Sequence, residues 1–255
     1  MRYINLIKNI SNWWLHFQIK FGRFNQNTAL WRTRNGVRLE VPVSLIHIFK
    51  EIFMEECYAH GAPLKIHEGM TVFDIGANIG VFTAFAAMKF PKAHIFAYEP
   101  IPANFAQLQK NAALNGDCHI VCVNQAVSAG RGEIVLRLAE NDFSTTASVS
   151  AVARGQALRE VRVPCAGIQE IFDDNGLDRC DFLKMDCEGA EYDAIFSCPK
   201  AYLKKIDRMA IEMHRGTKPE HNTALMRKYL DDNGFITFET PRALAMLYAW
   251  RESAA

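Results

Sequence analysis

The chain has little of what would assign it to several familiar classes of protein. Its 29 Lys and Arg residues nearly balance 28 Asp and Glu residues, so the formal net charge is only +1. Without an excess of positive charge there is no general attraction to nucleic acid, and we expect no nucleic-acid partner. Asn and His interrupt the apolar residues near the N-terminus, so we do not expect this segment to span a bilayer. It also has no small-residue cleavage site, so we expect no signal peptide.

The cysteines also lack the pattern of a disulfide framework or a zinc site. There are seven, which is an odd number, and no two pairs have metal-ligand spacing. We therefore expect reduced, buried and unreactive thiols in a cytoplasmic protein. The seven positions are Cys57, Cys118, Cys122, Cys165, Cys180, Cys187 and Cys198.

The turn most suggestive of a ligand has neither the Gly-x-Gly-x-x-Gly pattern of dinucleotide sites nor the Lys-Ser/Thr of the phosphate-binding loop. Instead, an apolar run over 71–75 contains Asp74, passes Gly76 and Gly80, and then becomes helix-like. This pattern predicts a strand, a tight turn and a helix start, where backbone can approach a ligand. A carboxylate repels a pyrophosphate but attracts a cation, so the pattern favours S-adenosylmethionine over NAD or ATP.

A second acidic residue follows at the end of the next predicted strand. The segment 94–98 is apolar and is followed by Glu99, a carboxylate well placed to accept hydrogen bonds from ribose hydroxyls. Pro100 is predicted to end this strand and begin a helix.

The rest of the chain alternates between strand-like and helix-like segments, which predicts a mostly parallel sheet covered on both faces. An insertion follows the third strand, with strand-like runs at 133–138 and 161–163 around a hydroxyl-rich stretch, 142–150, read as a surface loop or a substrate lid. Strands are predicted near 71–75, 94–98, 119–123, 181–186, 206–212, 235–239 and 245–250, and helices near 79–90, 102–115, 190–197 and 220–233.

The N-terminal region differs from the rest in charge. Residues 1–39 contain seven Lys and Arg residues and no Asp or Glu, and apolar residues recur there at helical spacing. We expect an amphipathic helix over 1–25, a β-hairpin turning at Asn35-Gly36, and a helix over 44–60. The helix over 1–25 either docks on the domain or a second subunit, or contacts a membrane surface peripherally. We place the boundary between this extension, 1–60, and the main domain, 61–255.

Five segments together resemble the FkbM family of S-adenosylmethionine-dependent methyltransferases, over roughly residues 30 to 240. The resemblance implies a Rossmann-like class I fold, with a mostly parallel seven-stranded sheet whose last strand is antiparallel. It also implies O-methylation, often of sugar or natural-product hydroxyls. One departure is at 167–172, where the family usually has a Leu-Asp pair. The segments are Phe73-Asp-Ile-Gly-Ala-Asn-Ile-Gly80, Tyr98-Glu-Pro100, Asn124-Gln-Ala-Val127, Phe182-Leu-Lys-Met-Asp-Cys-Glu-Gly-Ala-Glu191 and Ile211-Glu-Met-His214.

Strand ends place the candidate site residues around one crevice, because ligands of open parallel sheets bind beyond the carboxyl ends of the strands. We expect the turn to hold the methionine portion of S-adenosylmethionine, Glu99 its ribose, and the segment after the third strand its adenine. The expected cofactor-binding residues are Asp74, Gly76, Asn78, Gly80, Glu99, Pro100, Ala126 and Val127.

Transfer to a hydroxyl requires a group that accepts its proton, and Asp186, Glu188 and His214 are the catalytic candidates. His214 is attractive because a histidine ordinarily titrates near neutral pH. Glu191 either lines the same mouth or only caps the next helix. The same three candidates offer ligands for Mg²⁺, but such residues are common at strand ends without metal, so we expect none.

The function predicted is S-adenosylmethionine-dependent methyl transfer to a hydroxyl of a saccharide or natural product. Two alternatives remain on the same architecture: an NAD(P)-dependent oxidoreductase, and a non-catalytic cofactor-binding scaffold. Asp74 and the missing glycine pattern weaken the first alternative. The second predicts cofactor binding without turnover.

Overall fold

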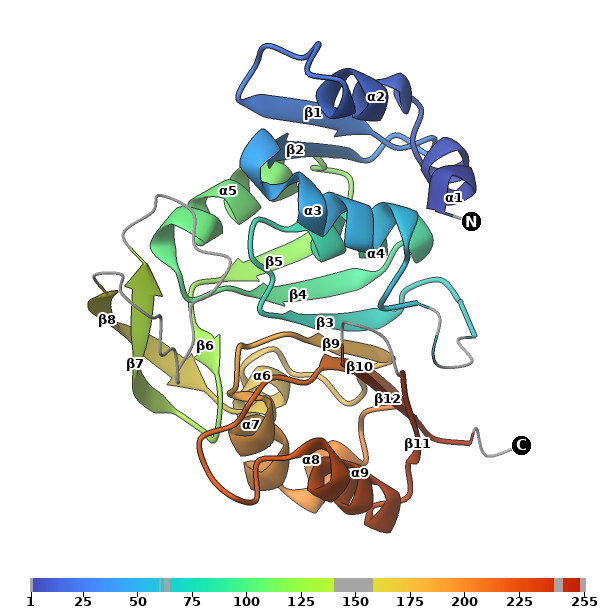
Figure 1. The fold of residues 1–255 in the computed structure, drawn as a ribbon. Helices are drawn as coiled ribbons and strands as arrows, with labels where there is room; N and C mark the ends of the chain where they lie inside the picture. The colour runs from blue at the N-terminus through green and yellow to red at the C-terminus, as the bar shows by residue number, and fades with distance from the viewer. Residues whose placement is uncertain (1, 60, 62–64, 140–157, 241–244, 253–255) are drawn as a thin grey trace.

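A seven-stranded sheet forms the centre of the molecule (Figure 1). The computed structural model describes residues 2–59, 61, 65–139, 158–240 and 245–252. The order of strands is β11-β12-β10-β9-β3-β4-β5, and only β12 runs antiparallel to its neighbours. This confirms the predicted fold class. The strands are β3 (Thr71–Ile75), β4 (His94–Tyr98), β5 (His119–Val123), β9 (Phe182–Met185), β10 (Arg208–Glu212), β11 (Ile236–Glu239) and β12 (Met246–Trp250).

Helices cover both faces of this sheet, because its central strands are apolar on both sides. Val72 of β3 joins the apolar cluster that contains α4, whereas Phe73 joins the cluster with α6, α7 and α9. The four helices predicted in the main domain, near 79–90, 102–115, 190–197 and 220–233, are confirmed as α4, α5, α7 and α9, but α6 and α8 were not predicted. One correction concerns Pro100: the helix begins at Pro102, which occupies its first turn. The helices are α4 (Val81–Lys89), α5 (Pro102–Ala113), α6 (Ile168–Asp174), α7 (Glu191–Ser197), α8 (Lys200–Leu203) and α9 (Thr223–Asp232).

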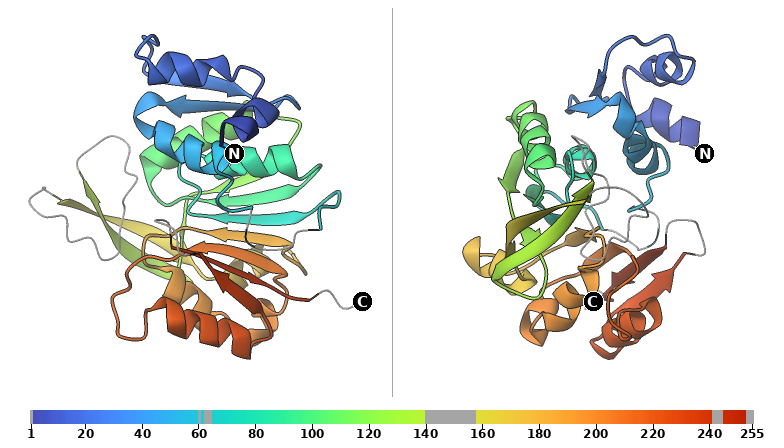
Figure 2. Two further views of the ribbon diagram at one scale, coloured as in Figure 1. Left: turned by 45° about the vertical axis from the view of Figure 1, so that its right-hand side comes forward. Right: turned by 60° about the vertical axis from the view of Figure 1, so that its left-hand side comes forward.

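The insertion after β5 forms a second, smaller sheet beside the first (Figure 2). It consists of β6 (Ala126–Val127), β7 (Gly132–Ala139) and β8 (Leu158–Ala166), in the order β6-β8-β7. The strand-like runs predicted at 133–138 and 161–163 lie in β7 and β8. The predicted loop over 142–150 lies outside the described residues. Because β6 pairs with β8, the insertion holds Ala126 and Val127 near the carboxyl edge of the main sheet.

The N-terminal extension is a helix pair, a hairpin and a second helical segment. The single helix expected over 1–25 is wrong: the structure has α1 (Arg2–Asn9) and α2 (Trp14–Lys20) instead. The helix is interrupted between α1 and α2 by contacts with β1. The side chain of Asn12 forms hydrogen bonds with the backbone of Leu30 and Arg32, and Ile10 forms an isolated β-bridge with Thr33. The predicted hairpin is confirmed as β1 (Thr28–Arg32) and β2 (Arg38–Pro42). A 3₁₀ turn at Val43–Leu45, α3 (Ile46–Phe49) and a π-helical segment at Lys50–Met54 follow.

Stacked aromatic rings join this extension to the main sheet. Trp31 stacks on Phe49 with ring centroids 4.0 Å apart, Phe49 on Phe53 at 5.0 Å, and Phe53 meets Phe85 of α4 edge-on at 5.4 Å. These rings belong to one apolar core that the extension shares with α4. Burial of such large rings stabilises the junction strongly. The boundary at 60/61 stays a prediction. Within the described ranges, the helices are too short or too polar to cross a bilayer.

Candidate functional site

The glycine turn after β3 fits tightly against the end of β9. Gly76 has a φ of +74° and Gly80 a φ of +85°, values that other residues rarely adopt. A Cβ at Gly76 would overlap the backbone oxygen of Asp186. The glycine therefore permits close approach of two backbone segments, in addition to any approach of a ligand. This contact holds the β3–α4 turn and the β9 end together.

Asp74 lies behind that turn, fully buried. Its carboxylate accepts a 2.5 Å hydrogen bond from the Thr83 hydroxyl and lies 3.3 Å from the ammonium of Lys184. Lys184 in turn donates to the backbone oxygen of Gly76 at 2.6 Å. Burial lowers the pKa of Lys184, but Asp74 and Asp186 raise it more, so its pKa lies above the usual value. The structure thus places Asp74 where it braces the turn through Lys184, and not among the residues lining a cavity.

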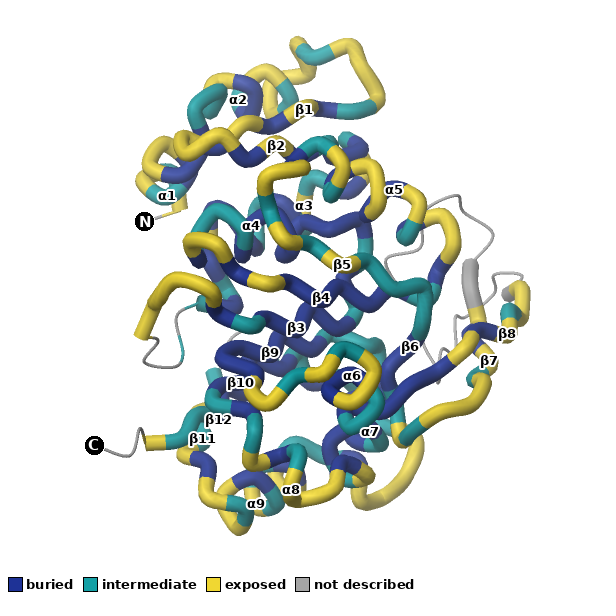
Figure 3. The backbone as a smooth tube through the Cα atoms, turned by 180° about the vertical axis from the view of Figure 1, so that it is seen from behind, coloured by how far each residue is buried: buried dark blue, intermediate teal, exposed yellow. Residues whose placement is uncertain are grey.

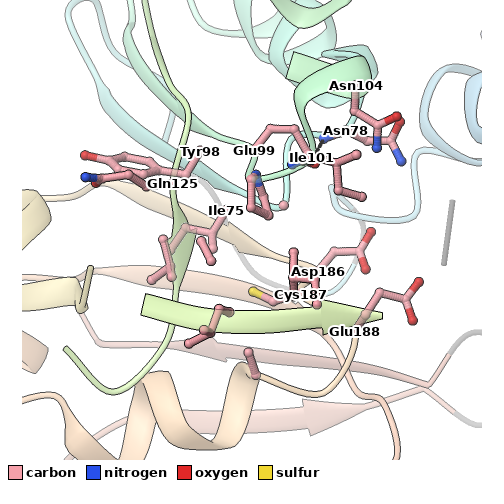
Figure 4. A pocket seen from close by; sticks show the side chains of 17 residues that line it. Ile75, Asn78, Tyr98, Glu99, Ile101, Asn104, Gln125, Asp186, Cys187 and Glu188 are labelled. Atoms are coloured by element: carbon pink, nitrogen blue, oxygen red, sulfur yellow. Dashed lines mark hydrogen bonds between the residues drawn. The ribbon is translucent and has the colours of Figure 1, made fainter. Parts of the chain in front are cut away.

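Glu99 is held at the end of β4 by backbone donors. Its two carboxylate oxygens accept hydrogen bonds from the N–H groups of Asn78, at 2.8 Å, and Ile101, at 2.9 Å (Figure 4). Burial raises the pKa of Glu99 to about 7, although these two donors favour the ionised form. Each carboxylate oxygen has a second lone pair, so the group retains capacity to accept from a ligand.

A cavity of about 600 Å³, here called the sheet-edge cavity, opens in front of Glu99. Its lining contains every expected cofactor residue except Asp74 and Gly80. Apolar side chains from β6 and β7 face Glu99 across it. Expected residues on its wall are Gly76, Asn78, Glu99, Pro100, Ala126 and Val127, with Gln125 beside them.

A second cavity of about 620 Å³ lies on the other side of the glycine turn. We call it the roofed cavity, because residues 47–58 of the extension cover it. The two cavities share Gly76, Asn78, Asp186 and Glu188 as a common wall. Two cavities that meet at one wall would place two bound molecules next to each other, which is the arrangement that a transfer reaction uses.

The three catalytic candidates come together at this wall. The Nε2 atom of His214 lies 3.8 Å from Asp186, 3.7 Å from Glu188 and 3.8 Å from Glu212. Tyr58 of the extension donates to Glu212 at 3.0 Å and to Asp186 at 3.3 Å. The cluster is therefore strongly acidic, and one hydroxyl from the extension bridges two of its carboxylates.

Glu191 supports this cluster from behind. It is fully buried at the first position of α7, and accepts hydrogen bonds from the N–H groups of Cys187 and Gly189. Its carboxylate also lies 2.9 Å from Nδ1 of His214. The structure supports neither of the two roles left open for Glu191, because the N–H groups that it binds precede α7 and it lines neither of the two cavities. Instead it braces the turn between β9 and α7 and orients His214.

These contacts change how the cluster titrates. Burial opposes the charge of His214, yet Glu191, Asp186 and Glu188 together raise its pKa to about 9. Burial raises the pKa of Glu188 to about 7 and that of Glu212 to about 6. The expectation that His214 titrates near neutral pH is not met, because paired carboxylates keep it protonated. Glu188 is the member of the cluster whose pKa lies near neutrality.

Asp186, Glu188 and His214 could also hold a metal ion, since their ligand atoms lie within 4.8 Å of one another. Two carboxylates and an imidazole suit a divalent cation. Binding would require His214 to lose the proton that its raised pKa retains.

Sequence reasoning missed four residues of the site: Glu51, Tyr58, Lys184 and Glu212. Lys184 and Glu212 lie inside motifs that carried the family resemblance, so their position next to Asp186 and His214 was a usable signal. Glu51 and Tyr58 had none, because they reach the site only through the fold of the extension.

Comparisons with known proteins agree with this geometry. A family model described as the methyltransferase FkbM domain matches residues 74–237. That span is more than half of the chain, so the chain belongs to the FkbM methyltransferase family. The fold and the family together identify an S-adenosylmethionine-dependent methyltransferase.

Two relatives and one solved structure illustrate the similarity. "Methyltransferase 1" of Beauveria bassiana (strain ARSEF 2860) is 29% identical over 223 residues, covering 79% of this chain and 85% of that protein. "31-O-demethyl-FK506 methyltransferase FkbM" of Streptomyces tacrolimicus is 25% identical over 193 residues, covering 66% and 74%. The crystal structure of methyltransferase FkbM from Methylobacillus flagellatus KT is similar in fold, with 17% identity and a TM-score of 0.50. That match covers 82% of this chain and about half, 54%, of that one.

Proposed function

We propose that this protein transfers a methyl group from S-adenosylmethionine to a hydroxyl group of a saccharide or natural-product acceptor. The observation that carries the proposal is the pair of cavities that meet at Gly76, Asn78, Asp186 and Glu188. The sheet-edge cavity takes the cofactor and the roofed cavity takes the acceptor. The name of the Streptomyces relative, which describes methylation of a natural product, supports the acceptor class.

The residues of the sheet-edge cavity fit S-adenosylmethionine. Glu99 retains lone pairs for ribose hydroxyls, and the apolar wall with Ile101, Ala126 and Val127 suits a purine ring. Asp186 and Glu188 at the far end place negative charge near a cationic ligand. When bound, the cofactor supplies an electrophilic methyl group on a positively charged sulfur.

The protein's own part of the reaction is alignment, exclusion of water and removal of one proton. As the acceptor oxygen forms its bond to the methyl carbon and the carbon–sulfur bond breaks, the hydroxyl proton passes to Glu188. Glu188 suits this step because its pKa of about 7 makes it an effective proton acceptor near neutral pH. Asp186 holds the hydroxyl, and protonated His214 stabilises the carboxylates around it.

The roofed cavity indicates which acceptors fit best. Glu51, Asp186, Glu188 and Glu212 line it together with Lys184, whose ammonium donates to backbone oxygens of the turn. Carboxylates accept hydrogen bonds from hydroxyl and ammonium groups but repel anions. Neutral or amine-bearing polyols should therefore be better acceptors than carboxylated or phosphorylated ones.

Calorimetric titration with S-adenosylmethionine and S-adenosylhomocysteine tests the cofactor half. Micromolar binding that Glu99→Gln weakens, and that the exposed control Glu68→Gln does not, supports the proposal. Fluorescence titration with NADH tests the oxidoreductase alternative. If NADH binds and neither sulfur compound does, the methyltransferase site is wrongly assigned.

Release of S-adenosylhomocysteine during incubation with candidate acceptors tests the second half. Neutral sugars, amino sugars and uronic acids of the same ring size should be compared at equal concentration. Turnover that falls from the first two classes to the third supports the acidic roofed cavity as the acceptor site. Cofactor binding without turnover on any hydroxylated acceptor would favour the scaffold alternative.

A further inference from the structure

The two N-terminal helices present apolar side chains to solvent. Ile4 is 68% exposed, Ile7 45%, Trp14 53% and Phe21 64%. We call these four residues the arm patch. Large exposed side chains are ordinary when scattered, but a cluster of them indicates an interaction surface. Figure 3 shows the exposed stretches on α1 and α2, at the end of the molecule away from β11 and β12.

Ring contacts show that the arm patch is continuous. Tyr3 stacks on Phe17 at 5.8 Å, and Phe17 stacks on Phe21 at 6.4 Å. Phe17 also meets Trp13 at 6.1 Å, and Trp13 meets Trp14 at 6.3 Å. One row of rings therefore links the exposed ends of Trp14 and Phe21.

The exposed isoleucines extend this row along α1. Ile7 lies one helical turn after Tyr3, and Ile4 lies three residues before Ile7 on the same side of the helix. Both isoleucines thus continue the surface that the rings begin.

The charge around the arm patch is entirely of one sign within residues 1–39. All seven basic residues of that segment are exposed, and it contains no Asp or Glu. The Lys20 ammonium lies over the rings of Tyr3 and Phe21, so cations and apolar rings share one surface. One acidic neighbour, Glu55, lies 3.6 Å from Arg2.

The side of α1 that faces away from the arm patch is fixed to the rest of the protein. Leu6 and Ile10 are fully buried, and Asn9 donates from its side chain to Phe53 and Glu56. Asn5 donates to the backbone oxygen of Met54. The arm patch is therefore not needed to hold the helices on the body, and it remains available for a partner.

We propose that the arm patch docks this protein reversibly on the surface of an anionic membrane. Tryptophan and phenylalanine beside lysine and arginine suit the interface between headgroups and acyl chains, and basic residues suit anionic lipids. A second copy of the chain fits less well, because a symmetric contact through this patch would bring two basic surfaces together.

The proposal also connects the membrane to the acceptor site. The π-helical segment Lys50–Met54 packs against α1, and its residues Glu51 and Ile52 line the roofed cavity. An arm bound to a membrane would therefore hold the roofed cavity close to the lipid surface, where amphiphilic or lipid-linked acceptors are concentrated. This last step rests on the proposed function, whereas the docking itself does not.

Co-sedimentation with vesicles tests the docking. The full chain should sediment with equimolar phosphatidylcholine and phosphatidylglycerol but not with phosphatidylcholine alone, and added salt should weaken the binding. Trp14→Ser/Phe21→Ser should lower the partition coefficient by about tenfold or more. Leu225→Ser, at a position 44% exposed on α9, is the matched apolar control and should leave it unchanged.

A second variant reverses the charge of two basic residues and leaves the apolar side chains of the arm patch unchanged. Lys20→Glu/Arg23→Glu should weaken binding on the order of tenfold, whereas Lys200→Glu on α8 should not. Calorimetric cofactor binding by each variant confirms that it is folded and that the methyltransferase site is unaffected. Equal sedimentation with neutral and anionic vesicles, or none with either, overturns the proposal. Light scattering that shows a dimer dissociated by Trp14→Ser/Phe21→Ser would instead identify a protein interface.

Discussion

The sheet-edge cavity and the roofed cavity share one wall but differ in origin and charge. The sheet-edge cavity is built entirely from residues 75–190, all inside the span that matches the FkbM family. The roofed cavity takes five lining residues, His47, Ile48, Glu51, Ile52 and Tyr58, from the extension outside that span. The sheet-edge cavity therefore lies wholly within the span that defines the family, whereas part of the roofed cavity comes from outside it.

The two cavities also differ in the acidic residues that line them. In the sheet-edge cavity, Glu99 accepts from backbone N–H groups and lies opposite apolar side chains of β6 and β7, with Asp186 and Glu188 at the far end. In the roofed cavity, four carboxylates face a space that the extension closes. Beyond the two carboxylates that both cavities share, the sheet-edge cavity thus adds Glu99, and the roofed cavity adds Glu51 and Glu212.

Removing the ammonium of Lys184 should have the largest effect, because it supports both cavities. Lys184→Met leaves the carboxylate of Asp74 buried without its cation, and should lower the free energy of unfolding by about 3–5 kcal/mol. Urea denaturation measures this. Lys92→Met, which breaks an exposed pair with Glu68, should cost less than about 1 kcal/mol. If Lys184→Met/Asp74→Asn is no more stable than Lys184→Met, the pairing is not what stabilises the turn.

Adding a methyl group at Gly76, in the wall that the two cavities share, should lower stability almost as much as Lys184→Met does. Gly76→Ala combines a disfavoured positive φ with overlap against the backbone of Asp186, so we expect a loss of about 2–4 kcal/mol and of cofactor binding. Thermal unfolding and calorimetry test this together. Gly116→Ala, which has open space around it, is the control and should be nearly neutral. Wild-type cofactor affinity in Gly76→Ala would contradict the close fit of the two backbone segments.

Asp186→Asn should separate chemistry from binding at the shared wall. The amide keeps the shape but loses the charge, so kcat should fall about 10²-fold while cofactor affinity changes less than about threefold. Steady-state release of S-adenosylhomocysteine and calorimetry measure the two quantities. Asp178→Asn, at a fully exposed site, should leave both unchanged. Full activity in Asp186→Asn would remove that residue from the reaction.

Titration of Glu99 in the sheet-edge cavity should make the affinity for the cofactor depend on pH. Because its pKa is about 7 without ligand, Glu99 is increasingly protonated below pH 7, and ribose hydroxyls donate better to the ionised form. Affinity should therefore rise with pH through about 7, by up to about tenfold per pH unit below the pKa. Calorimetry across this range should show the dependence reduced in Glu99→Gln and retained in the exposed control Glu68→Gln.

The raised pKa of Glu99 makes the stability of the protein without ligand change with pH in the opposite direction: stability falls as pH rises. A carboxyl raised from 4.5 to about 7 contributes stability that is complete below 4.5 and is lost as pH rises through about 7. The difference in unfolding free energy between the wild type and Glu99→Gln should follow that direction. A pH-independent difference would show that Glu99 has the same pKa in the folded and unfolded states.

Metal removal should have the smallest effect and would sharpen the description of the acidic cluster. His214 keeps its proton at neutral pH, so we expect chelator-treated protein to retain its activity. Activity that is lost with chelator and restored by Mg²⁺ or Mn²⁺ would instead assign Asp186, Glu188 and His214 as metal ligands.

Much of the main sheet was predictable because its signals are local. Apolar runs bounded by Asp74, Glu99 and Asp186 gave the strands closely, and Asn35-Gly36 gave the hairpin. The N-terminal helices were predicted less well. Helical periodicity over 1–25 could not show that Asn12 would bond the edge of β1 and divide the helix.

The candidate site shows the same division. Strand ends placed Glu99, Asp186, Glu188 and His214 around one crevice, and the structure brings them together. It could not be predicted that Asp74 would face Lys184 behind the turn, or that Glu191, Asp186 and Glu188 would raise the pKa of His214. Such shifts depend on distances between residues far apart in the chain.

The sequence by itself determined the family, the parallel sheet and the carboxylates at its edge, because periodicity, glycine turns and acidic strand ends are local properties. The tertiary structure decided which of those carboxylates face a cavity, which are buried behind it, and that Tyr58 and Glu51 of the extension close the second chamber. Burial and charge pairing are set by non-local packing, so only the folded chain fixes the protonation of the site and the surface left open on the N-terminal helices.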